Sequence, residues 1–172
     1  MTKREVLVKM VEERFSDNVR PADEEDEIFE SRDPGVRDFM KFINGKDWKD
    51  FLAYLQTGKF SKVQYFGGMI SFMTPKAFHY FTPSLLIAVL TADISQLADT
   101  FFSRLMPRPD DEVGRIDRIL DTYSEQQKSV IALVVEQYAH FTPPFGSRID
   151  EDLYQYWKPM LPQKGGVRNK RM

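Results

Sequence analysis

The chain has 172 residues, of which 42% are hydrophobic and 13% aromatic, and its formal net charge is −2. This composition suits one folded domain with its own core and argues against intrinsic disorder. The absence of cysteine excludes disulfides, thiolate nucleophiles and cysteine-based metal sites. The first residues lack the apolar region of a signal peptide, and the longest apolar stretch, Leu85 to Leu90, is far too short to span a membrane. We therefore expect a cytoplasmic protein that has neither nucleic acid nor membrane as its partner.

Signals for helix starts and stops divide the first half of the sequence into helical segments. Thr2 and Glu5 have the spacing of a capping box, so a helix is expected from that point. Pro21 precedes a run of acidic residues, which the positive end of a helix dipole favours, and it predicts a short helix next. Further signals of this kind are the starts at Asp33 and Trp48 and the glycine stops at Gly45 and Gly58. From 59 to 72 the signals are weak, and we expect an irregular stretch.

In the second half of the sequence, threonine followed by proline marks the main helix boundaries. In Thr74-Pro75 and Thr82-Pro83 the proline keeps the threonine out of the helical region, where its oxygen can cap a helix. Each of these two pairs is therefore predicted to begin a helix. A third pair, Thr142-Pro143, follows the last long helix.

The remaining segments also have helical periodicity. Apolar residues from Ile94 to Leu105 share one face, and Pro107 ends that segment. Ser124 with Gln127 is a second capping box. Helices are also expected over 113–123 and 153–157. Because no strand alternates with these segments, the sequence predicts an all-α fold, a single compact domain of roughly eight helices over 1–162 with a basic flexible tail over 163–172.

No catalytic motif can be recognised in the sequence. Glycine-rich phosphate loops, a nucleophile elbow and a zinc-binding histidine pair are all missing. His79 and His140 both lie among aromatic residues, and we expect both to be structural. Glu136 and His140 share a helical face, but a two-metal site would need a second such pair. We therefore expect no enzymatic activity, no cofactor and no metal.

Acidic residues gather between positions 23 and 30 with no basic residue among them. The run is either a solvated acidic segment or an anionic surface that steers and docks a basic partner. Ile28 and Phe29 within it could anchor that partner or could pack the segment onto the core. The predicted partner-binding residues are Asp23, Glu24, Glu25, Asp26, Glu27, Ile28, Phe29 and Glu30.

Three segments of the sequence carry a resemblance. Residues Phe72 to Leu86 resemble F-L-T-P-E-A-F-R-Y-Y-L-P-A-Y-L, the hallmark of a family of small, uncharacterised bacterial helical proteins. Ser124 to Val130 resembles a helix start S-P-E-Q-R-x-x-V, and Asp152 to Trp157 resembles a terminal A-L-x-x-Y-W. The chain departs from the hallmark at His79, where the family has arginine, and at the pair 81–82. The resemblance implies a fold more than a function, although proteins of this kind are similar to bacterial toxin-immunity proteins.

Together these observations lead to an expected function with two alternatives. The expected function is that of an immunity protein, which binds and neutralises a cognate basic toxin domain, such as a nuclease, through its acidic surface. The first alternative is a small helical enzyme that uses His79 or His140 with a nearby carboxylate. The second is a regulatory protein that self-associates through an apolar surface patch.

Overall fold

Helices make up the architecture of the described part of the chain. The computed structural model describes residues 1–31, 33–57, 69–92, 95–141 and 148–163. Its elements are α1 (Lys3–Arg14), α2 (Glu25–Ile28), α3 (Pro34–Ile43), α4 (Trp48–Gln56), α6 (Pro75–Thr91), α7 (Ser95–Ser103), α8 (Arg115–Leu120), α9 (Glu125–Phe141), α10 (Arg148–Trp157) and the 3-10 turn η1 (Lys158–Met160). Those ranges contain no strand, only an isolated bridge between Phe29 and Met73, so the prediction of an all-α fold is confirmed.

Some sequence predictions fall outside these ranges. They concern Gly58, the pair Thr142-Pro143, the irregular stretch up to residue 68, and the tail beyond Gln163. In the part that is described, no helix is both long enough and apolar enough to cross a membrane.

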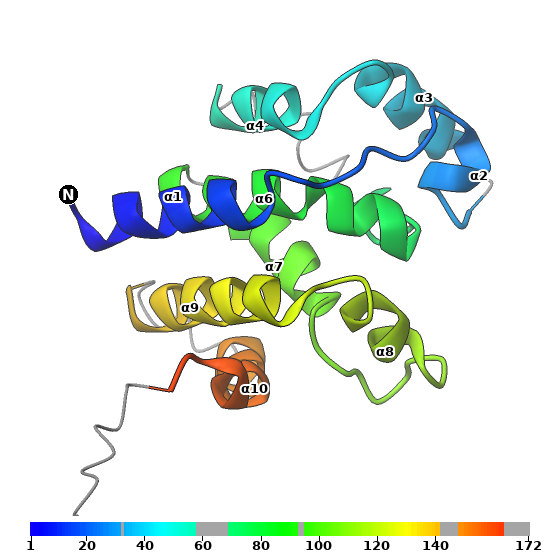
Figure 1. The fold of residues 1–172 in the computed structure, drawn as a ribbon. Helices are drawn as coiled ribbons and strands as arrows, with labels where there is room; N and C mark the ends of the chain where they lie inside the picture. The colour runs from blue at the N-terminus through cyan, green and yellow to red at the C-terminus, as the bar shows by residue number, and fades with distance from the viewer. Residues whose placement is uncertain (32, 58–68, 93–94, 142–147, 164–172) are drawn as a thin grey trace, which may run out of the picture.

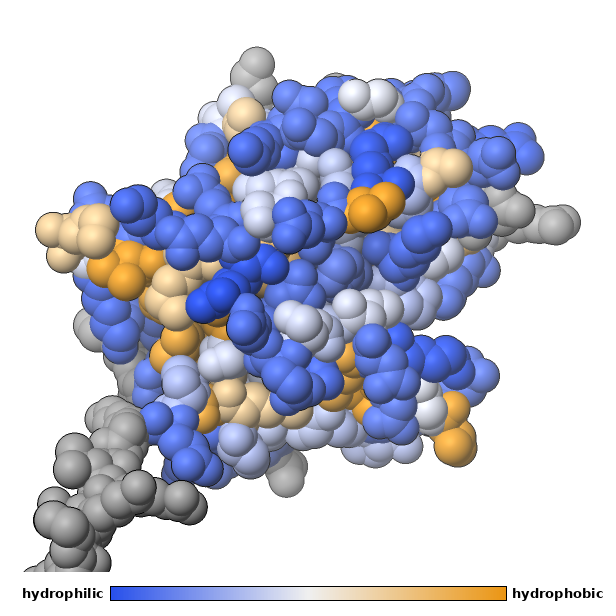
Figure 2. Space-filling model, in the orientation of Figure 1, coloured by the Kyte–Doolittle hydropathy of each residue, from blue (hydrophilic) through white to orange (hydrophobic). Residues whose placement is uncertain are grey.

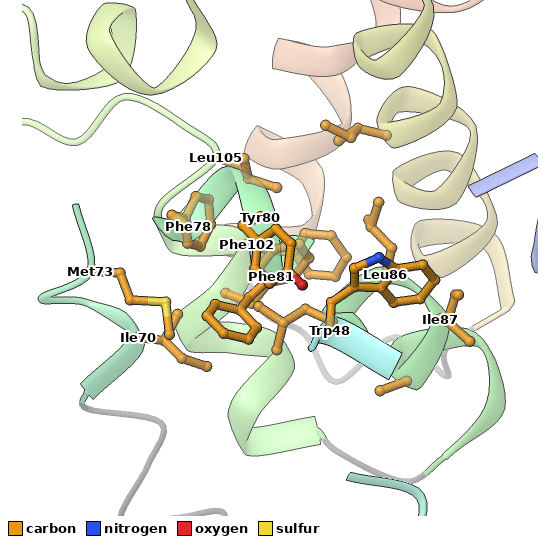
Figure 3. Packing of buried hydrophobic residues seen from close by; sticks show 14 of the residues in the cluster. Trp48, Ile70, Met73, Phe78, Tyr80, Phe81, Leu86, Ile87, Phe102 and Leu105 are labelled. Carbon is orange, nitrogen blue, oxygen red and sulfur yellow. The ribbon is translucent and has the colours of Figure 1, made fainter. Parts of the chain in front are cut away.

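Helix α6 lies at the centre of the fold (Figure 1). It contacts α4 on one side and α1 and α9 on the other, and α10 packs against α9. Almost all side chains from Ala77 to Leu90 are buried, as expected for a helix that is apolar on every face. Figure 3 shows Phe81 and Leu86 of α6 packed with Trp48 of α4 and Phe102 of α7. The core is therefore organised around one helix with neighbours on all sides.

Most of the predicted helix starts are confirmed. Thr2 and Glu5 form their capping box, and Asp33 caps α3 with Pro34 in the first turn. Helix α3 ends at Ile43, and Gly45 follows with a φ of 70°, in the left-handed region that glycine tolerates. The short helix predicted after Pro21 is present as α2, but it begins at Glu25 and not at Pro21. The preceding Arg20 is instead tied to the end of α3, where it donates to the carbonyl of Ile43 at 3.2 Å.

The predicted helix start at Thr82-Pro83 is also wrong, because α6 continues through Pro83. Proline has no amide hydrogen, so it cannot make the helical bond to the carbonyl of His79. The side-chain amide of Asn18 donates to that carbonyl at 3.2 Å and replaces the missing donor. Thr82 Oγ does not cap a helix but bonds the carbonyl of Phe78 at 2.8 Å and the hydroxyl of Tyr123 at 2.5 Å. Tertiary contacts thus let the helix accommodate its proline.

Candidate protein-binding surface

The acidic segment is fixed to the core by its two apolar residues. Ile28 and Phe29 are 0% and 3% exposed, and the ring of Phe29 lies 5.7 Å from that of Phe39 in α3. Their prediction as anchors for a partner is therefore wrong, because a side chain in the core cannot reach another protein. The other interpretation, that they pack the segment onto the core, is confirmed.

Backbone hydrogen bonds hold this segment against the turn that precedes α6. The amide of Glu30 donates to the carbonyl of Phe72 at 2.7 Å, and the amide of Thr74 donates to the carbonyl of Ile28 at 2.8 Å. Thr74 also caps α6, accepting from the amide of Ala77, and donates its hydroxyl to the carbonyl of Glu27 at 2.8 Å. The start of α6 and the acidic segment consequently form one unit.

A buried arginine supports that turn from beneath. Arg104 is 6% exposed and donates to the carbonyls of Ile70 and Met73 at 2.5 and 2.9 Å. Its guanidinium also lies 4.7 Å from the centre of the Phe78 ring. Burial lowers the pKa of Arg104 to about 10, and the negative charge of Glu30 opposes this shift. The guanidinium is thus a cation at neutral pH, and Glu30 stabilises it.

The acidic side chains differ in how far their charges are compensated. Asp23 pairs with Arg20, and the hydrogen bond from Arg20 lowers its pKa. Glu27 pairs with Lys76, with 3.5 Å between the carboxylate oxygen and the ammonium nitrogen.

The other acids have no such partner among the described residues. Glu24 is exposed and Glu25 half-buried, and neither makes an ion pair there. Glu30 is exposed and makes no direct ion pair in that part of the chain. The side chain of Asp26 lies outside the description. The uncompensated charge of this surface therefore resides on Glu24 and Glu25, and on Glu30 apart from its longer-range effect on Arg104.

An exposed aromatic residue that the sequence did not single out adjoins Glu30. Phe72 is 37% exposed, and its carbonyl is the acceptor for the amide of Glu30. It lies in the stretch without helical periodicity, so no pattern assigned it to a face; only its position at the start of the family hallmark drew attention to it. We use the name acidic surface for Glu24, Glu25, Glu30 and Phe72. Figure 2 shows that the surface over α2 and α3 is largely hydrophilic, whereas apolar side chains gather over the beginning of α1 and the adjoining part of α9.

The two histidines do not converge on one site. His79 Nε2 lies 3.1 Å from the side-chain oxygen of Gln127 in the first turn of α9. His140 is near the other end of the same helix, about 20 Å away at 1.5 Å per residue, and its side chain is not described. No carboxylate of a described residue pairs with His79. Where the side chains are described, no three acidic or histidine residues are grouped as metal ligands would be.

A shallow hollow of about 520 Å³ lies between the end of α7 and α10. Its lining is mainly apolar, from Met106, Pro107, Pro109 and Tyr156, with Ser103, Arg108 and Asp152 as its polar groups. The Ser103 hydroxyl already donates to the carbonyl of Thr100 at 2.8 Å. Among the described residues, no histidine lines the hollow.

Comparison with known proteins adds no relative. No family model, no curated protein and no solved structure matches this chain. The family resemblance of the hallmark segment stays a prediction, and the functional argument depends on the geometry of the site.

Proposed function

We propose that this chain is an immunity-type inhibitor that binds and neutralises a basic toxin domain, such as a nuclease. The observation that carries the proposal is the pair of uncompensated carboxylates, Glu24 and Glu25, which belong to a segment fixed to the core. A nuclease active site is cationic because it holds phosphates, and a rigid row of carboxylates can occupy it in their place. Charges held in a fixed geometry steer such a partner and bind it without a large ordering cost.

The residues of the segment that attach it to the fold are different from those that carry its uncompensated charge, and this supports a role in binding. Ile28 and Phe29 and the backbone of Glu27 and Glu30 attach it to the fold. Like charges in close sequence repel one another, and at physiological salt they are screened only beyond about 8 Å. Since Glu24 and Glu25 make no ion pair within the described residues, a basic partner offers the compensation that the chain itself does not.

We propose a role without catalysis because the residues that the enzyme alternative needs are not brought together. His79 contacts Gln127 in the first turn of α9, whereas His140 belongs to the last turn of the same helix. The self-association alternative would use the apolar strip over α1 and α9 in Figure 2. Val6 of α1 is an exposed apolar residue, at 38%. This alternative predicts a particle mass that rises with concentration, and the inhibitor does not.

A pair of matched variants tests the proposed function. The tagged protein is used to capture the toxin-like product of the neighbouring gene, and the same toxin is expressed with it in cells. The binding variant is Glu24→Gln with Glu25→Gln; the control is Glu12→Gln with Glu13→Gln, an adjacent exposed pair on α1 with the same change in charge. We expect the first variant to lose binding by about tenfold or more and to lose salt dependence, and the control to protect cells as the wild type does.

The possible results separate the site from the function. Equal binding by both variants would move the interface away from Glu24 and Glu25. Capture of no basic protein by the wild type, together with no protection of cells, would refute the inhibitor itself.

A further inference from the structure

The imidazole of His79 lies where α1, α6 and α9 meet. The ring of Phe15, at the end of α1, is 5.9 Å from it, and the ring of Tyr123 is 4.9 Å from it. Gln127 in the first turn of α9 is its hydrogen-bond partner, at 3.1 Å. The same glutamine amide donates to the carbonyl of Arg14 at 3.0 Å, so one side chain joins all three helices.

The hydrogen bonds around Gln127 fix which nitrogen of His79 carries the proton. The Gln127 oxygen accepts from the backbone amide of Ser124 at 3.0 Å, and its nitrogen donates to the carbonyl of Arg14. Both partners are backbone groups with only one role, so the glutamine cannot be turned around. Its oxygen therefore faces His79, and Nε2 of the neutral imidazole must be the donor.

A second proton on this ring would enter at Nδ1, where the described residues supply no acceptor. No carboxylate among them forms an ion pair with His79, and the ring would carry its charge between the aromatic rings of Phe15 and Tyr123. Burial lowers the pKa of His79, while its bond with Gln127 opposes the shift.

Ionisable groups on the surrounding elements are engaged elsewhere or are exposed. On α6, Lys76 pairs with Glu27, and on α9, Lys128 pairs with Glu125. The Tyr123 hydroxyl is bonded to Thr82. Of the others, Arg14 donates its guanidinium to Gln126, the exposed Asp17 accepts from Ser16, and Lys9, Glu12 and Glu13 of α1 are exposed.

The segment that follows α1 is held by the same network. The side-chain amide of Asn18 donates to the backbone carbonyl of His79 at 3.2 Å, and the Gln127 side-chain nitrogen donates to the Asn18 side-chain oxygen at 3.3 Å. His79, Gln127 and Asn18 therefore form a closed set of hydrogen bonds, to which His79 contributes both its imidazole and its backbone carbonyl. A charged imidazole that turns toward water would leave Gln127 and the ring of Phe15, and this would weaken the network that holds residues 14–18.

We propose that protonation of His79 is a pH-sensitive switch that releases residues 14–18 from α6 and α9. This segment leads directly into the acidic segment, so acid would loosen the connection between α1 and α2. The inference concerns the conformation of the chain and does not depend on the proposed inhibitor function.

The direction of the effect follows from the change in proton affinity. The released imidazole takes up a proton at about pH 6.5, whereas the packed imidazole does so at a lower pH. The packed state is thus fully favoured above that pH and loses stability as the pH falls below it, by up to tenfold for each pH unit.

Amide hydrogen exchange at two pH values tests the switch, after correction for intrinsic exchange rates. Between about pH 7.5 and about pH 5.5, protection of residues 14–18 should fall, by up to about tenfold, in the wild type. His79→Gln, which keeps a donor for Gln127 but cannot titrate, should show no such fall. His140→Gln, the control that removes the other histidine, should behave as the wild type does.

Three results would overturn the proposal. The first is that protection of residues 14–18 in the wild type does not change between the two pH values. The second is that protection falls equally throughout the core. The third is that His79→Gln shows the same fall with pH as the wild type. If His79→Gln does not fold, an NMR titration of the wild-type imidazole replaces it. The native imidazole must then titrate below about pH 6.5, and a midpoint at or above that pH would contradict the switch.

Discussion

The hydrogen bond from the Asn18 side chain to the carbonyl of His79 explains how Pro83 is tolerated inside α6. Its contribution to the free energy of unfolding can be predicted. In Asn18→Ala this carbonyl, in a part-buried site, loses its side-chain donor and cannot recover the helical one. An unpaired polar group of this kind costs about 1–3 kcal/mol. We therefore expect Asn18→Ala to lower the free energy of unfolding by about 2 kcal/mol, partly through its weaker contact with Gln127.

Restoring the helical donor should remove part of that cost. In Pro83→Ala the new amide can donate to the carbonyl of His79, because residues 79 and 83 have the spacing of a helical hydrogen bond. Pro83→Ala has its own mixed effect: it gains helix propensity but loses a buried ring and the stiffness of the unfolded chain. A double-mutant cycle cancels these terms. Asn18→Ala should cost about 1 kcal/mol less in the Pro83→Ala background than in the wild type.

Urea unfolding of the four proteins, followed by helical circular dichroism, measures this coupling. Asn44→Ala serves as the matched control, because Asn44 is an exposed asparagine at the end of α3. Its effect should add to that of Pro83→Ala within about 0.5 kcal/mol. If Asn18→Ala and Pro83→Ala are also additive within that margin, the carbonyl of His79 is not their link, and our account of the proline is refuted.

Three further predictions concern the support of the acidic segment and the packing of the last helix. Ile28→Ala should cost about 2–5 kcal/mol in urea unfolding, and a loss under 1 kcal/mol would mean that this side chain is not in the core. Arg104→Met leaves the carbonyls of Ile70 and Met73 without their donor and should cost about 2–4 kcal/mol by the same assay. A neutral result there would show that desolvation of the guanidinium cancels its bonds. Trp157→Phe should lower the thermal midpoint by an amount equivalent to about 1–3 kcal/mol, since the indole donates to the buried carbonyl of Leu105 at 2.7 Å; an unchanged midpoint would contradict this.

Local chemistry was enough to predict several helix starts. A capping box such as Thr2 with Glu5, or Ser124 with Gln127, forms bonds between residues three positions apart. The neighbouring sequence is therefore enough to predict the helix start. Thr74 behaves in the same way, although its hydroxyl also reaches the distant Glu27.

The failures involve partners far away in the sequence. Thr82-Pro83 has the local signature of a helix start, but the helix continues through it. Asn18 supplies the donor for the carbonyl of His79, and the hydroxyl of Tyr123 bonds that of Thr82. Neither partner could be located from periodicity. In the same way, a buried Arg104 looks like one more surface cation in a helical segment until the carbonyls of the turn before α6 are placed beside it.

The acidic segment shows why composition located a candidate site but not the role of each residue. A one-turn helix is too short for periodicity to separate its faces, so Ile28 and Phe29 were open to two interpretations until their burial was known. With that resolved, the fold accounts for the two apolar residues, for the backbone bonds of Glu27 and Glu30, and for the charge of Glu30 near Arg104. It does not account for the charges of Glu24 and Glu25, which make no ion pair in the described part of the chain and repel each other. Under the proposed function, a basic partner would supply the compensation that the fold does not.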